Sequence, residues 1–173
     1  PQDHGPQDAC GVIGIYAPGE EVSKLTYFGM YALQHRGQES AGMAVSDGRH
    51  MMVFKDMGLV SQVFDEATLN SLQGHMAVGH TRYSTTGASI WDNAQPTFRS
   101  RQGGDGLALA HNGNLTNTGA LEALIAERAP DTEVPHKDRM DSSSDTSLVT
   151  ALMTTYDGTL EEVAAQVLPH LQG

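Results

Sequence analysis

The sequence predicts an α+β fold, in which strands and helices gather in separate layers of one domain. The chain has 173 residues, which is enough to bury a hydrophobic core. Hydrophobic residues make up 39% of it, and its 19 glycines bring the apolar share to that of an ordinary globular protein. Strand and helix patterns come in blocks rather than in strict alternation, which favours α+β layers over a doubly wound sheet.

The charge balance narrows the classes of partner. The chain has 10 basic and 21 acidic side chains, a formal net charge of −11. A polyanion would meet a repulsive field, so we expect no nucleic-acid partner. No apolar run approaches the roughly 18 residues that a membrane span needs, so we expect no membrane partner. Residues 1–9 lack the basic and apolar parts of a signal peptide, which indicates a cytoplasmic protein.

The first half of the chain carries a strand and a long helix. Residues 10–17 form a β-branched apolar run that predicts a buried strand, closed by Pro18-Gly19. Residues 20–35 predict a helix that stops at Gly37, because its apolar residues recur at helical spacing: Val22, Leu25, Phe28, Ala32 and Leu33. Gly29 inside this helix costs about 1 kcal/mol relative to Ala, which predicts a close packing contact there.

Three strands and a helix are expected next. Residues 40–48 and 49–58 predict two strands, and Asp47-Gly48 between them is typical of a hairpin turn. Residues 59–72 are expected to be helical, and residues 75–83 predict another strand. The small, polar residues of 84–96 predict a loop, and with Gly87 they make it a candidate lid.

The last part of the chain is mainly helical. Residues 106–114 predict a strand that runs into a turn, followed by a helix over 116–129 with Leu121, Leu124 and Ile125 on one face. A charged loop spans 129–144. Residues 145–158 predict a helix that begins at a Ser/Asp cap, and residues 159–173 predict a final one.

The single cysteine, Cys10, has two interpretations. It cannot form an internal disulfide, and the histidines lack metal-site spacing, so no metal site is expected in this chain. Cys10 is either a small buried hydrophobe or a nucleophile exposed when residues 1–9 are removed as a leader. A free α-amine, with a pKa of about 7.7–8.0, could take the thiol proton and pass it to a leaving amine.

Three further positions have both a structural and a chemical interpretation. Asn112-Gly113 is either a turn with positive φ or a pair of donors for a tetrahedral oxyanion. Arg82 is either a surface charge at a strand end or a fork that binds a carboxylate. Asp145 is either a helix N-cap or the partner of an ammonium group. Together with Cys10, the chemical interpretations match one ligand, a free glutamine that is being deamidated.

The order of the motifs resembles one known family. The matching segments are CGVIGIYA, GMYALQHRGQESAGMAV, GHTRYSTTG, LALAHNGNLTN and SSSDTS, which run from residue 10 to about residue 150. They resemble the glutaminase part of the glutamine phosphoribosylpyrophosphate amidotransferases. LQHRGQESAG is the discriminating segment, because related class II glutaminases such as glucosamine-6-phosphate synthase read more like YRGYDSAG there.

The resemblance implies a fold and a set of roles. It implies a four-layer αββα sandwich of the N-terminal-nucleophile hydrolase type over residues 10–173, after a leader at 1–9. Cys10 would be the nucleophile, and Asn112 and Gly113 would form the oxyanion hole. The implied substrate-binding residues are Arg82, Thr85, Asp145, Arg36, Gly37 and His80.

The resemblance also implies the reaction. Glutamine would be hydrolysed to glutamate and ammonia through a thioester, and the ammonia would convert phosphoribosyl pyrophosphate to 5-phosphoribosylamine, the first committed step of purine (IMP) synthesis. The phosphoribosyltransferase domain, with its motif like DDSIVRGTT and its implied Mg²⁺, is not found here, so we expect a truncated glutaminase domain that needs no cofactor itself. The intact enzyme is expected to be a homo-oligomer. Another N-terminal-cysteine amide hydrolase, an amidotransferase with a different acceptor, and a non-enzymatic binding or regulatory module stay open.

Overall fold

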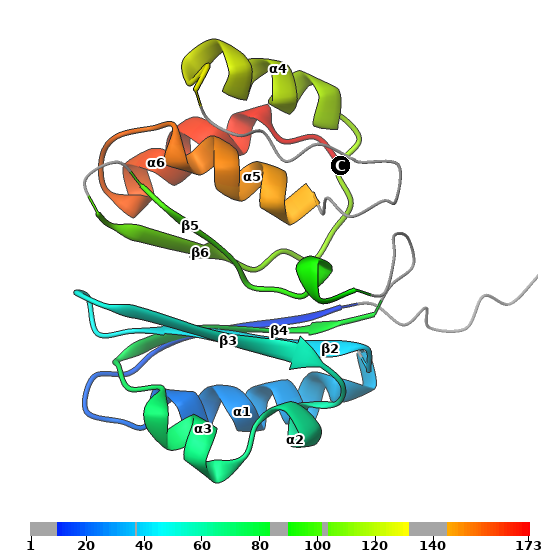
Figure 1. The fold of residues 1–173 in the computed structure, drawn as a ribbon, viewed down its shortest axis with the longest axis vertical. Coiled ribbons are helices and arrows are strands. Elements are labelled where there is room, and N and C mark those ends of the chain that lie inside the picture. Colours follow the sequence, from blue (N-terminus) through cyan, green and yellow to red (C-terminus); the bar gives the residue numbers. More distant parts are fainter. Residues whose placement is uncertain (1–9, 37, 84–89, 102–103, 132–144) are drawn as a thin grey trace, which may run out of the picture.

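Four layers make up the molecule, which is a computed structural model that describes residues 10–36, 38–83, 90–101, 104–131 and 145–173. Helices cover one face of a four-stranded sheet, a two-stranded sheet faces its other side, and further helices cover that second sheet (Figure 1). The predicted α+β class and the αββα layering are confirmed. None of the described helices combines the length and apolar character that crossing a membrane requires.

The four-stranded sheet is antiparallel throughout. Its strands are β1 (Gly11–Tyr16), β2 (Ser40–Ser46), β3 (Met51–Met57) and β4 (Met76–Arg82), in the order β1-β4-β2-β3. The strand predicted first, β1, is not buried on both faces, because it lies at the edge of the sheet. Ile13 and Ile15 pack against the core, whereas Val12 and Tyr16 on the other face are exposed.

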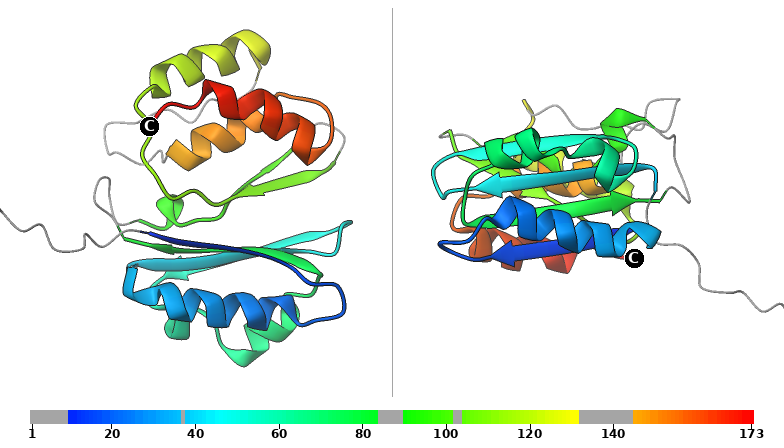
Figure 2. Two further views of the ribbon diagram at one scale, coloured as in Figure 1. Left: turned by 180° about the vertical axis from the view of Figure 1, so that it is seen from behind. Right: turned by 90° about the horizontal axis from the view of Figure 1, so that it is seen from below.

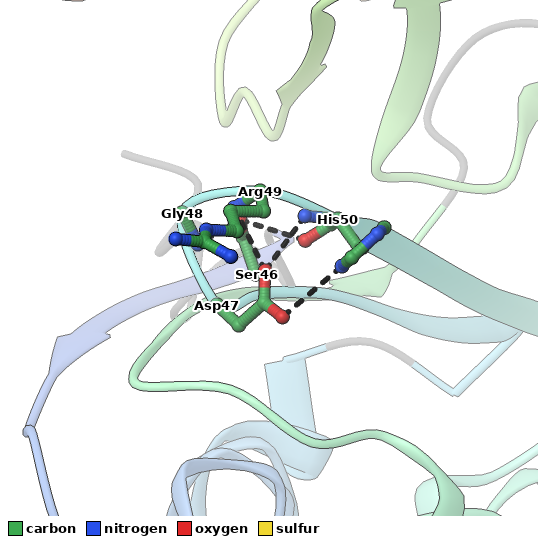
Figure 3. A network of polar contacts seen from close by, with 5 residues as sticks. All are labelled: Ser46, Asp47, Gly48, Arg49 and His50. Carbon is green, nitrogen blue, oxygen red and sulfur yellow. Dashed lines mark hydrogen bonds and ion pairs between the residues drawn. The ribbon is translucent and has the colours of Figure 1, made fainter.

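The hairpin between β2 and β3 forms at the predicted Asp47-Gly48 turn (Figure 3). Asp47 Oδ1 accepts hydrogen bonds from the backbone N–H groups of Arg49, at 2.8 Å, and His50, at 2.6 Å. These bonds hold the pKa of the Asp47 carboxyl far below its usual range. Gly48 takes a φ of +86°, the left-handed conformation that such a turn requires.

The first helical layer contains α1 (Val22–Leu33), α2 (Val60–Val63) and α3 (Glu66–Ser71), and a 3₁₀ turn, η1 (Gln34–Arg36), extends α1. Residues 59–72 are mainly helical, as predicted, but they form two short helices: the chain breaks and restarts at Asp65, whose Oδ1 caps α3 by accepting the Thr68 N–H at 2.7 Å. The contact predicted at Gly29 is confirmed, since a Cβ there would overlap Ile13.

The buried face of α1 differs from the prediction. The helix buries Val22, Thr26 and Met30, whereas Leu25 and Phe28 are 43% and 66% exposed. A polar residue can lie on the buried face because the Thr26 hydroxyl donates to Val22 O at 2.7 Å. Gly79 of β4 leaves room for this face, since a Cβ at Gly79 would come within 2.7 Å of both Thr26 and Met30.

The second sheet and its helices form the other half. Strands β5 (Thr97–Ser100) and β6 (Gly106–Leu109) pair antiparallel, and β5 was not predicted. Over them lie α4 (Thr118–Arg128), α5 (Asp145–Thr154) and α6 (Leu160–Val167), with a second core centred on Leu121, Ile125 and Leu152 (Figure 2). Helix α6 ends at Val167, short of the predicted bound, and a 3₁₀ turn, η3 (Leu168–His170), follows.

One connection joins the two sheets. It leaves β4 at Tyr83, passes through a 3₁₀ turn, η2 (Trp91–Asn93), and enters β5. At the other end of the interface, an apolar cavity of about 430 Å³ separates the sheets and is lined by residues that include Tyr16, Ala44, Met76, Ala108 and Leu160.

Candidate active site

The described residues of the predicted site converge at one edge of the sandwich, where β1 begins and β4 ends, on the right of Figure 1. Cys10 immediately precedes β1, and Arg82 ends β4. Because β1 and β4 pair antiparallel, with Gly11 opposite Thr81, the start of one strand lies beside the end of the other. The turn after β6 and the first turn of α5 reach the same edge from the second half (Figure 1).

Cys10 is held at this edge by contacts from three segments. Its Sγ lies 3.5 Å from both the backbone N and the backbone O of Tyr83. Its carbonyl oxygen accepts hydrogen bonds from Asn112 Nδ2, at 2.6 Å, and from Arg36 Nε, at 3.4 Å. The cysteine is half-buried rather than enclosed in a core, so the interpretation as a buried hydrophobe is wrong.

Asn112 and Gly113 lie next to Cys10, although Asn112 is 102 residues away from it in the chain. The Asn112 amide has two N–H groups, so one can bind the Cys10 carbonyl while the other meets a ligand. Gly113 does not adopt a positive φ, so the turn that Asn-Gly suggested is not formed. A Cβ at Gly113 would lie 2.8 Å from His111 Nε2, so the His111 ring would have to shift to admit a side chain there.

Arg82 is a buried charge rather than a surface one, with 8% of the residue exposed. Its Nη1 donates to Asn93 O at 2.8 Å, and its Nε lies 3.7 Å from Glu39 Oε2. Glu39 reaches this position because it immediately precedes β2, where Ser40 lies opposite Arg82. The guanidinium is therefore oriented by partners on two sides, and it has further N–H donors for a carboxylate.

Asp145 joins α5 to the turn that carries Asn112. It is the first residue of α5, and its Oδ2 accepts the Leu115 N–H at 2.6 Å. This bond places a carboxylate beside the segment that directly follows Asn112-Gly113. The site therefore combines the thiol of Cys10, amide donors, the cation Arg82 and the anion Asp145.

The remaining predicted residues have different outcomes. Arg36 contacts Cys10, as described above, whereas Gly37 and residues 84–89 of the candidate lid, which include Thr85, lie outside the described residues. His80 is completely buried, and burial lowers its pKa to about 4. Its complete burial argues against direct contact between His80 and a bound substrate.

Some residues of the site were not predicted. Tyr83 could have been found, because it follows Arg82 at the end of a predicted strand. Glu39 also had a signal, as an acid immediately before a strand in the discriminating motif. Gln95 had none, because its contact with His111 depends on how the chain folds back. Among the residues that the structure describes, no group of three or more His, Cys, Asp or Glu side chains could hold a metal ion.

Comparison with known proteins agrees with this site. No family model matches the chain. It is 52% identical over 178 residues to the amidophosphoribosyltransferase of Mycobacterium bovis, an alignment that covers 98% of the chain. The chain belongs to the amidophosphoribosyltransferase family. A second member of the family, from Synechococcus elongatus, is 65% identical over 123 residues, or 70% of the chain.

Solved structures in the family have the same fold. The glutamine phosphoribosylpyrophosphate amidotransferase from Bacillus subtilis, complexed with ADP and GMP, superposes with a TM-score of 0.76 at 35% identity over 94% of the chain. A structure described as the allosteric regulatory enzyme of purine biosynthesis gives a TM-score of 0.78 at 36% identity. The chain matches the N-terminal glutaminase part of these enzymes, and it spans only 32% of the Mycobacterium bovis relative and 33% of the Bacillus subtilis one.

Proposed function

We propose that this chain is the glutaminase part of an amidophosphoribosyltransferase and that it hydrolyses the side-chain amide of glutamine. The observation that carries the proposal is the contact of Asn112 Nδ2 with Cys10 O at 2.6 Å, which joins a nucleophile and an oxyanion donor from different halves of the molecule. Membership of the family supports the choice of glutamine as substrate.

In this proposal the two charged ends of glutamine bind opposite charges. The substrate carboxylate binds Arg82, whose guanidinium is already oriented by Asn93 and Glu39. The substrate ammonium binds Asp145. The family resemblance also assigns Arg36, Gly37, Thr85 and His80 to substrate binding. Of these, Arg36 contacts Cys10, and the complete burial of His80 favours an indirect role.

The nucleophile is activated by the chain itself. We infer that residues 1–9 are removed, which frees the α-amine of Cys10 as the base that takes the Sγ proton. The thiolate then attacks the amide carbon of glutamine, and the charge that develops on the carbonyl oxygen is stabilised by Asn112 Nδ2 and Gly113 N–H.

The tetrahedral intermediate collapses when its C–N bond breaks. The protonated α-amine gives its proton to the departing nitrogen, so ammonia leaves and a thioester of Cys10 remains. Water then attacks the thioester, the α-amine accepts a proton from that water, and glutamate leaves as Cys10 recovers its thiol.

The fate of the ammonia is a further part of the proposal. In the complete enzyme it displaces pyrophosphate from phosphoribosyl pyrophosphate and forms 5-phosphoribosylamine, in the first committed step of purine (IMP) synthesis. Mg²⁺ would serve that phosphoribosyltransferase part, and no step described for this chain uses a metal. A homo-oligomer and a cytoplasmic location stay predictions.

Glutamine hydrolysis by two variants tests this function. Cys10→Ala removes the nucleophile, so turnover should fall by roughly a thousandfold or more while the unfolding temperature stays unchanged. Arg82→Lys keeps the positive charge but loses the paired N–H donors of the guanidinium, so KM should rise on the order of tenfold, with a smaller change in kcat. Asparagine, a shorter amide, is the control substrate. Full turnover by Cys10→Ala, or equal turnover of asparagine, would contradict the proposal.

A further inference from the structure

The segment that connects the two sheets contacts two parts of the site through three consecutive residues, 93–95. These parts are Arg82 and the turn that carries Asn112 and Gly113. Asn93 O accepts the bond from Arg82 Nη1 at 2.8 Å. Ala94 O accepts a bond from Lys55 Nζ at 2.6 Å. The side-chain Oε1 of Gln95 accepts the backbone N–H of His111 at 2.8 Å. Residue 93 therefore meets the cation of the site, and residue 95 meets the turn that carries the oxyanion donors.

Gln95 is enclosed where this contact is made. Only 6% of the residue is exposed, and its bond to the half-buried His111 is partly buried, which limits competition from water. Its backbone oxygen packs directly against Gly42 of β2, where a Cβ would overlap it. The position of Gln95 is therefore set by the sheet that also carries Arg82.

The same segment is anchored on its other side by β3. Trp91 Nε1 donates to Lys55 O at 3.0 Å, and Lys55 Nζ lies 4.7 Å from the centre of the Trp91 ring. With the bond from Lys55 to Ala94 O, residues 91–95 are attached to the first sheet at several points. Gln95 therefore presents its side chain to the second half of the molecule from a fixed base.

We propose that Gln95 is a positioning residue for the oxyanion donors, an inference that rests on the proposed glutaminase function. By holding the His111 amide, its Oε1 orients the Ala110–His111 peptide, one residue before Asn112 and Gly113. A displacement of about 1 Å in catalytic groups can cost roughly a hundredfold in rate. Gln95 touches neither the thiol nor the groups that bind the ends of glutamine.

This role predicts a specific kinetic pattern. Oxyanion donors act on charge that develops in the transition state, so loss of their orientation lowers kcat and leaves ground-state binding in place. Binding of the product glutamate, which uses Arg82 and Asp145, should be unchanged. Alkylation of Cys10 by iodoacetamide needs a thiolate but no oxyanion donor, so its rate should also be unchanged.

The test compares substitutions at Gln95 in the complete, processed protein. Gln95→Leu and Gln95→Asn remove the acceptor or shorten its reach, and kcat for glutamine should fall about tenfold to a hundredfold. Gln95→Glu keeps an acceptor at the same reach and should recover most of kcat. Gln62→Leu is the matched control, because Gln62 Oε1 accepts a backbone N–H, that of Leu59, at 3.0 Å in the helical layer on the far side of the first sheet.

Each outcome decides the role. The positioning role is supported if Gln95→Asn lowers kcat and speeds hydrogen exchange at the His111 amide. Inhibition by glutamate and the rate of Cys10 alkylation should then stay within about threefold of wild type. An unchanged kcat in Gln95→Asn, or an equal loss of kcat in Gln62→Leu, overturns the positioning role of Gln95. In that case, glutamine hydrolysis by the wild-type protein still supports the proposed glutaminase function. Wild-type protein that hydrolyses no glutamine overturns the proposed function, and this role with it.

Discussion

At the scale of single residues, two charged groups of the site lie deep in the molecule. Arg82 and Glu39 have side chains that are 10% and 15% exposed, and they face each other at 3.7 Å. A buried charge is tolerated when it is paired and hydrogen-bonded, and Asn93 O supplies such a bond to Arg82. The sequence alone left Arg82 open between a surface charge and a carboxylate fork, because the strand end does not reveal that Glu39 lies beside it.

His80 makes stability depend on pH. Burial holds its pKa at about 4, against an ordinary value of 6.5, and the positive charge of Arg82 lowers it further. The unfolded chain binds the proton more readily, so the stabilisation is complete above pH 6.5 and is lost as the pH falls toward 4. The free energy of unfolding should drop by about 3 kcal/mol over this range on account of this group.

Denaturant unfolding at several pH values measures this effect. In His80→Gln, which has no titrating ring, the decrease between pH 6.5 and 4 should be smaller than in wild type by that amount. The exposed His170→Gln serves as the control and should follow wild type. Parallel curves for His80→Gln and wild type would refute the assignment.

At the scale of elements, the absence of a side chain at Gly42 lets the connection between the sheets pack closely against β2. A Cβ at Gly42 would overlap Gln95 O and come within 2.6 Å of Lys55 Cβ. Gly42→Ala should therefore lower the free energy of unfolding by about 1–3 kcal/mol. It should also lower kcat for glutamine, because Gln95 moves.

Gly14→Ala is the control for this substitution. Gly14 lies in β1 of the same sheet and has no atom within 4 Å of the place where a Cβ would stand. Its stability should stay the same or rise slightly, since Ala loses less conformational entropy than Gly on folding. Equal effects of the two substitutions on unfolding and on kcat would show that the contact with Gln95 has no role.

The elements that could be predicted are those that local chemistry defines. The hairpin at Asp47-Gly48 is an example, because its turn is formed by residues 46–50 alone (Figure 3). Strand β5 was missed, because Thr97–Ser100 is short and mostly polar and gains its strand geometry only by pairing with β6. The buried face of α1 was misassigned for a similar reason, since Gly79 of β4 makes room for Thr26 and Met30, whereas Leu25 and Phe28 stay exposed.

At the scale of the whole molecule, the site exists only when both halves are docked. Cys10, Arg36 and Arg82 belong to the first sheet and its helices, whereas Asn112 and Asp145 belong to the second half (Figure 1). The motifs named these residues as candidates, because each has a chemistry of its own, and the structure brings Cys10, Asn112 and Arg36 into contact. Asn93 and Gln95 could not be predicted, because their contacts depend on how the connection between the sheets folds back, whereas Glu39 had a signal as an acid immediately before a strand.

The most direct test of the central claim is labelling with a reactive glutamine analogue, followed by mass spectrometry of the labelled peptide and of the intact chain. The account predicts one label in this chain, on Cys10, in molecules that have lost residues 1–9, and no label in Cys10→Ala. Excess glutamine should protect against labelling. A label on another residue, or glutamine turnover by a chain that still carries residues 1–9, would contradict the account.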